Sequence, residues 1–141
     1  MRLWHKDLIQ VLPDKQLLGQ WRECCLIAKL VKENGTPNHL LVNKVTQFPI
    51  DHLYTYASLV YNEMTGRGFN CNWQSIEKHL PSGHLSFISM DQLFNTEDLH
   101  WHNTRYFWQC YYNLEEKHDC GGIDPQEWLF ITEFVGPIPQ I

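Results

Sequence analysis

The sequence lacks an uninterrupted apolar run of the ~18 residues that a membrane-spanning helix requires. It also lacks the apolar core of a signal peptide, because Arg2, Lys6 and Asp7 interrupt its first residues. Its five cysteines are an odd number, and Cys24 and Cys25 are adjacent, which disfavours a disulfide framework. We therefore expect a cytoplasmic protein with reduced thiols and no membrane partner.

The chain also lacks the excess of positive charge that is typical of nucleic-acid-binding proteins, because its net charge is −5 at pH 7. The charges are unevenly distributed along the sequence. Residues 1–44 contain seven cations and four acids, whereas residues 45–141 contain four cations and twelve acids. The first segment therefore carries +3 and the second −8, so the positive charge gathers near the amino terminus.

No alternating strand pattern, internal repeat or low-complexity segment is visible in the 141 residues. A chain of this length is typical of one domain with a core that folds unaided. We expect a compact, mostly α domain over residues 1–141 that is monomeric. Three main helices and an irregular, aromatic-rich carboxy-terminal region are predicted for it.

Apolar residues at three- and four-residue steps predict the most distinct helix over residues 14–33, which Asn34 and Gly35 end. Within this helix Arg22 and Glu23 lie away from the apolar stripe. A second helix is predicted over residues 49–65, where a proline suits the first turn.

The second half of the chain gives weaker signals. Residues 72–80 predict a short helix, and the apolar content of residues 85–94 predicts the third substantial helix. A turn or two of helix is expected near residues 103–114. Recurrent glycine and proline, including Pro125, predict that the remaining tail is irregular.

The amino terminus brings together groups that suit imine chemistry on a sugar. A backbone amine is partly in its neutral, nucleophilic form near neutral pH. The carboxylate of Glu23 could stabilise a cationic sugar and transfer a proton, while Arg2 and Arg22 could hold phosphates. An ordinary chain terminus and a solvated Arg-Glu pair would leave the same pattern, so the residues alone do not decide.

Three short segments carry a family resemblance. Met1-Arg2-Leu3, residues 16–23 and residues 67–70 (Arg-Gly-Phe-Asn) resemble the phage pyrimidine-dimer DNA glycosylases of the endonuclease V type, over about residues 1–113. The resemblance implies a compact helical domain that flips a damaged base and cleaves through an imine, without a metal or cofactor. It implies that Glu23 is the catalytic carboxylate, that Arg22 and Arg2 bind DNA phosphates, and that the partner is double-stranded DNA with a damaged base or abasic site.

The sequence departs from that family in ways that change the expected chemistry. The family's nucleophile is a small residue exposed by methionine removal, but here Arg2 is too large to permit removal, so the Met1 amine is the expected nucleophile. The family's proteins are basic, whereas this chain is acidic. Gln16 stands where the family has a histidine, which leaves open whether the lesion is a pyrimidine dimer or another damaged base.

Three other interpretations remain open from the sequence. A non-catalytic DNA- or protein-binding module could keep the fold and lose the chemistry. The aromatic residues of segment 101–112 could stack on bases, although a core role is favoured. Zinc could be bound by a late group of side chains, but their spacing matches no familiar finger, and no metal site is predicted. That group comprises His100, His102, Cys110, His118 and Cys120.

Overall fold

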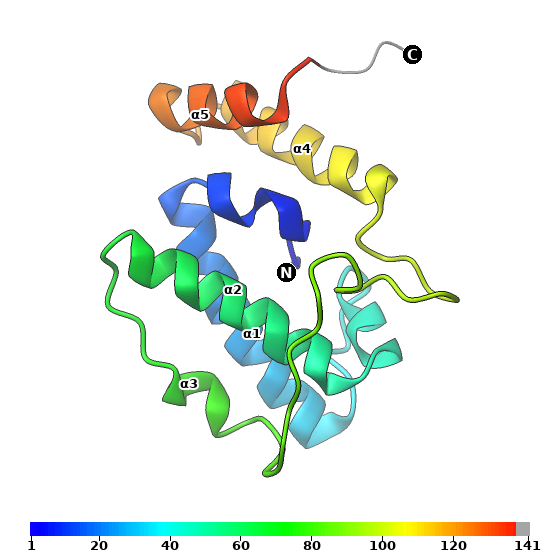
Figure 1. The fold of residues 1–141 in the computed structure, drawn as a ribbon. Coiled ribbons are helices and arrows are strands. Elements are labelled where there is room, and N and C mark those ends of the chain that lie inside the picture. Colours follow the sequence, from blue (N-terminus) through cyan, green and yellow to red (C-terminus); the bar gives the residue numbers. More distant parts are fainter. Residues whose placement is uncertain (138–141) are drawn as a thin grey trace.

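Two helical layers enclose the amino terminus of the chain (Figure 1). The computed structural model describes residues 1–137. Its helices in chain order are η1 (Lys6–Val11), α1 (Asp14–Asn34), η2 (Asn43–Gln47), α2 (Ile50–Gly66), α3 (Gln74–Glu77), α4 (Thr104–Asp119) and α5 (Pro125–Val135), where η marks a 3-10 helix. Helix α1 packs on α2, while η1 contacts both α2 and α5 and so lies between the layers.

Helix α1 confirms the prediction for residues 14–33 within one residue. Its buried side chains follow the helical period, so one face supplies the core. Gly35 ends the helix with a left-handed φ of 75°, and its N–H donates to the carbonyl of Val31 at 2.9 Å. This conformation strains a residue with a side chain, which explains why glycine stands at the stop.

Helix α2 also matches its prediction, because it begins at Ile50, directly after Pro49, and ends at Gly66. Leu53, Tyr56 and the other apolar positions of one face are buried. Residues 1–137 contain no strand, only an isolated bridge. The prediction of a mostly α fold is therefore confirmed.

The helix predicted over residues 85–94 is wrong, because this segment is irregular. Side chains of α2 bind its backbone N–H groups in place of helical carbonyls. Ser86 donates to Asp51 at 2.8 Å, Ile88 donates to Thr55 at 2.9 Å, and Phe94 donates to His52 at 3.0 Å. The segment therefore lies along α2 without forming a helix, since residues 90–94 make only turns. The third main helix lies elsewhere.

The carboxy-terminal region is more regular than predicted. Helix α4 runs through Asp119, well beyond the expected turn or two. Helix α5 replaces the expected irregular tail, because Pro125 occupies its first turn and does not break it. The side chain of Asp124 accepts the N–H of Gln126 at 2.9 Å and so caps the helix. Among residues 1–137, no helix combines the length and the hydropathy that crossing a bilayer requires.

Candidate active site

The first residues of the chain form an extended segment that α1 holds from one side. The N–H of Arg2 donates to Glu23 Oε2 at 3.0 Å. Gln20, one helical turn earlier, donates from Nε2 to the carbonyl of Arg2 at 2.9 Å and accepts the N–H of Trp4 at Oε1, at 2.7 Å. Two adjacent side chains of α1 therefore pair with three backbone groups of the terminal segment.

Two tyrosines hold the same segment from other elements. The hydroxyl of Tyr56, on α2, lies 2.5 Å from the carbonyl of Trp4 and 2.9 Å from Gln20 Oε1, so its single proton is shared between two acceptors. Tyr106, on α4, donates to the carbonyl of Leu3 at 2.6 Å. Burial raises the pKa of both phenols, which keeps them in the protonated form that donates.

This anchoring brings the Met1 amine close to a carboxylate. Three covalent bonds separate the amine from the Arg2 nitrogen, so the two nitrogen atoms lie within about 4 Å. The amine and Glu23 Oε2 are therefore no more than about 7 Å apart. Both residues are half-buried, and Glu23 Oε1 accepts no hydrogen bond from the residues that the structure describes. Both groups are thus free to reach one bound sugar.

The two arginines have different surroundings. The guanidinium of Arg2 lies over the rings of Trp4 and Tyr106, with its carbon 5.4 Å and 6.0 Å from their centroids, and Nη1 is 3.8 Å from Cys110 Sγ. Burial raises the pKa of the Cys110 thiol, so the sulfur is the uncharged form. Arg22 is exposed beside Glu23. Arg2 is therefore held in place by aromatic faces, whereas Arg22 projects into solvent.

A known family shares the segment that contains Met1, Arg2, Gln20, Glu23 and Tyr56. A family model described as pyrimidine dimer DNA glycosylase matches residues 1–77. The chain belongs to the pyrimidine dimer DNA glycosylase family. Neither a curated protein nor a solved structure matches it.

In this glycosylase-family chain, residues 67–70, the last of the three segments that carry the resemblance, connect other elements of the structure. The guanidinium of Arg67 donates to the carbonyl of Leu12 at 2.7 Å and pairs with Asp14 at 3.0 Å and Glu63 at 3.1 Å. It thereby ties the junction between η1 and α1 to the end of α2. Arg67 is therefore a support for the terminal segment and not a member of the reacting site.

A second amine, that of Lys6, lies near the terminal segment. Its side chain is buried, and Nζ donates to the carbonyls of Met90 and Leu93, the latter at 3.0 Å. Burial lowers the pKa of Lys6. The two carbonyl acceptors nevertheless bind its protons and cover its nitrogen, so this lysine is a poorer nucleophile than the half-buried terminal amine.

Sequence reasoning missed Gln20, Tyr56 and Tyr106 as parts of this site. Gln20 left a signal, because it is a polar residue at a position of the apolar stripe of α1, and it is 1% exposed. Tyr56 fits the apolar face of α2, and this pattern gives no sign that its hydroxyl binds the terminal segment. Tyr106 lies 103 residues from its partner Leu3, so no local pattern could reveal the contact.

The late histidines and cysteines occupy separate environments. His102 is buried and accepts the N–H of Lys6 at 3.0 Å, whereas His118 stacks on Trp128 at 4.6 Å and Cys120 is exposed. Within residues 1–137 there is no group of three or more His, Cys, Asp or Glu side chains that could hold a metal ion. The zinc interpretation therefore has no ligand set in the described part of the chain.

The thiols of α1 are unsuited to nucleophilic catalysis. Burial raises the pKa of Cys24 well above its usual value and that of Cys25 to about 11. Both sulfurs are therefore almost wholly protonated near neutral pH, and a thiol is a far weaker nucleophile than a thiolate.

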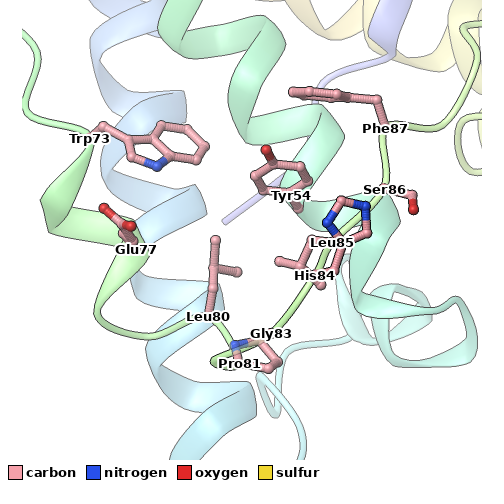
Figure 2. A pocket seen from close by; sticks show the side chains of 10 residues that line it. All are labelled: Tyr54, Trp73, Glu77, Leu80, Pro81, Gly83, His84, Leu85, Ser86 and Phe87. Carbon is pink, nitrogen blue, oxygen red and sulfur yellow. The ribbon is translucent and has the colours of Figure 1, made fainter.

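A cavity lies apart from the terminal amine. Figure 2 shows Tyr54, Trp73 and Phe87 around a space of about 570 Å³ between α2, α3 and the loop that follows. None of the residues that line it belongs to α1 or to the terminal segment. The cavity contains one carboxylate, Glu77, and no amine or arginine, so it lacks the groups that the imine chemistry needs.

Proposed function

We propose that the protein is a DNA glycosylase with a coupled abasic-site lyase activity, acting through an imine formed by the Met1 amine. The observation that carries the proposal is the 3.0 Å hydrogen bond from the Arg2 N–H to Glu23, which keeps amine and carboxylate together. The family description supports pyrimidine dimers as the lesion. Gln16 leaves another damaged base as a variant of the same proposal.

In the first stage the neutral amine attacks C1′ of the damaged nucleotide. The glycosidic bond breaks, and the base leaves with the bonding electron pair and takes up a proton. The attached nitrogen, positively charged after the attack, then loses a proton and regains an electron pair. This pair forms the C=N bond of a protonated imine as the C1′–O4′ bond opens, and O4′ takes the bonding pair and a proton. The carboxylate of Glu23 stabilises the positive charge that develops on the sugar during these steps.

In the second stage the imine acts as an electron sink. Glu23 removes a proton from C2′, whose electrons move into a double bond between C2′ and C3′ as the 3′ phosphate leaves with the C3′–O bonding pair. Water then hydrolyses the C=N bond and restores the free amine. Arg22 and Arg2 hold phosphates on either side of the reacting sugar.

Borohydride trapping tests the proposal directly. Untagged protein with a free amine, verified by intact mass, is incubated at low salt with a duplex containing an abasic site, and borohydride then reduces the C=N bond to a stable link. We expect a covalent adduct that peptide mass spectrometry places at Met1. An adduct at Lys6, or no adduct, would overturn the proposed mechanism.

The matched control blocks the amine without altering the fold. Acetylation of the purified terminus, or a Gly-Ser extension, should abolish the adduct and retain the thermal unfolding midpoint. A duplex with a thymine dimer and an undamaged duplex then separate base removal from strand cleavage. Adduct formation on the abasic duplex alone would support the lyase and not the dimer glycosylase.

A non-catalytic DNA- or protein-binding module is the second candidate. The net charge of −5 favours it over a DNA-repair enzyme, because contacts of cations with phosphates supply most of the nonspecific affinity for DNA. The same experiment separates the two functions. Binding of the abasic duplex without a covalent adduct, from protein with a free amine, would favour the module.

A further inference from the structure

A second cavity lies next to the terminal segment, between η2, the turn at residues 100–103 and the first turns of α4. Its volume is about 320 Å³. The polar side chains that line it are those of Lys44, His100, Asn103, Arg105, Tyr106 and Gln109. All can donate hydrogen bonds, and two of them carry a full positive charge.

The charge of this cavity sets it apart from the rest of the surface. No Asp or Glu lines it, and neither Lys44 nor Arg105 makes an ion pair among residues 1–137. Four other cavities in the described residues are each lined by at least one carboxylate: Glu77, Asp7, Glu63, Asp91, Asp14 or Glu127. In a chain of net charge −5, a cavity with cations alone is a selective place for an anion.

This basic cavity is physically continuous with the candidate active site through Tyr106. The ring of Tyr106 lines the cavity, while its hydroxyl donates to the carbonyl of Leu3 at 2.6 Å. The Arg2 guanidinium lies 6.0 Å from the same ring. An anion in the cavity would therefore be separated by the Tyr106 side chain from the segment that carries the Met1 amine.

We propose that the basic cavity binds a phosphodiester of the DNA strand close to the reacting sugar, with Lys44 and Arg105 as its ligands. The inference rests on the proposed function for the identity of the anion. Arginine can hold two phosphate oxygens at once, and lysine supplies a compact charge. The amino end of α4, where Asn103 caps the helix, adds positive partial charge on the same side.

Salt dependence of DNA binding measures the number of phosphates neutralised. Fluorescence anisotropy would follow untagged protein on a labelled duplex with a tetrahydrofuran abasic analogue, which cannot form an imine, across a series of salt concentrations. For K44A/R105A we expect the slope of log affinity against log salt to flatten by about 0.9, the value for one neutralised phosphate. Affinity at low salt should fall roughly tenfold for each lost contact.

The matched control is K29A/K117A, which removes the same charge from two exposed lysines outside the cavity. It should leave the slope nearly unchanged. Equal slopes for the two double variants would overturn the proposal. Lys44 and Arg105 are exposed, and K44Q/R105Q replaces the alanine pair if circular dichroism shows that the pair is unfolded.

Two further measurements separate the possible failures. The parent protein could trap no imine and yet bind DNA with a salt dependence that flattens in K44A/R105A. This result would overturn the proposed function and support the phosphate site. Binding of a mononucleotide as tightly as the duplex would assign the cavity to a free phosphate compound and overturn the DNA assignment.

Discussion

Residues 1–77 and residues 78–137 contribute different things to the candidate active site. The first region, which the family model matches, holds the amine of Met1 and the carboxylate of Glu23. The second region supplies Tyr106, which binds the carbonyl of Leu3, and His102, which binds the N–H of Lys6 at the start of η1. The groups that we propose to react therefore come from one region, and part of their positioning comes from the other.

The two regions also satisfy their backbone hydrogen bonds differently. In the first region the N–H groups of α1 and α2 are bonded within the helices, as local sequence signals predict. In the second, the irregular segment 85–94 relies on side chains of α2. Local signals therefore specify the scaffold that carries the chemistry, whereas tertiary contacts specify the elements that cover it.

The largest expected effect belongs to Glu23→Gln. This variant keeps the shape of the side chain and its bond to the Arg2 N–H, but it removes the charge and the proton acceptor. The rate of strand cleavage at saturating abasic duplex should fall by roughly 10²- to 10⁴-fold, the usual range for general acid–base catalysis. Glu33→Gln, an exposed change near the end of the same helix, is the control. Cleavage by Glu23→Gln at the parent rate would remove the basis of the mechanism.

A pair of variants distinguishes a side chain that positions the Met1 amine from one that only stabilises the fold. Gln20→Ala deprives Trp4 N–H and the Arg2 carbonyl of their partners, and Thr55→Val does the same to the Ile88 N–H. Each should lower the free energy of unfolding by about 1–3 kcal/mol. Misplacement of the amine should also make Gln20→Ala roughly 10- to 100-fold slower in single-turnover trapping at saturating DNA.

Thr55→Val should trap at the parent rate, because it disturbs segment 85–94 and not the terminal segment. Both variants must be assayed well below their unfolding midpoints, so that the folded fraction is the same. If they slow trapping equally, Gln20 acts through stability alone and has no positioning role.

Stability should depend on pH through three buried histidines, which accept backbone N–H bonds at Nδ1 and so are neutral: His5, His52 and His102. Burial lowers the pKa of each below the usual 6.5. Above pH 6.5 neither the folded nor the unfolded chain protonates them. Below it the unfolded chain gains protons that the folded chain refuses, so the free energy of unfolding falls.

The loss should reach about 1.4 kcal/mol per pH unit for each histidine that stays neutral when folded. Urea unfolding between pH 6.5 and 5.5 measures it above the range where most carboxylates titrate. His102→Asn keeps an acceptor for the Lys6 N–H and should flatten the dependence, whereas His84→Asn, an exposed change, should not. A stability that is constant over this range would show that the histidines protonate in the folded state.

The parts of the fold that the sequence predicted are those whose signals are local. Helix α1 has an apolar period and a Gly35 stop, and the proposed role of Glu23 likewise rests on a short motif of neighbouring residues. The contacts of Tyr106 and His102 join residues about a hundred positions apart, so no window of sequence contains them. Helix α5 was missed for another reason, since Pro125 was interpreted as a breaker although proline is favoured in a first helical turn.

The smallest expected effect concerns the start of α5. Asp124→Ala removes the side chain that caps α5 through the N–H of Gln126, which should lower the free energy of unfolding by about 1 kcal/mol. Asp124→Asn retains a capping oxygen and should recover most of the loss. Both variants should trap DNA at the parent rate, because α5 covers η1 and carries no group of the candidate site. A slower trapping rate in Asp124→Ala alone would mean that α5 positions the amino terminus through η1, and the second region would then contribute more to positioning than Tyr106 and His102.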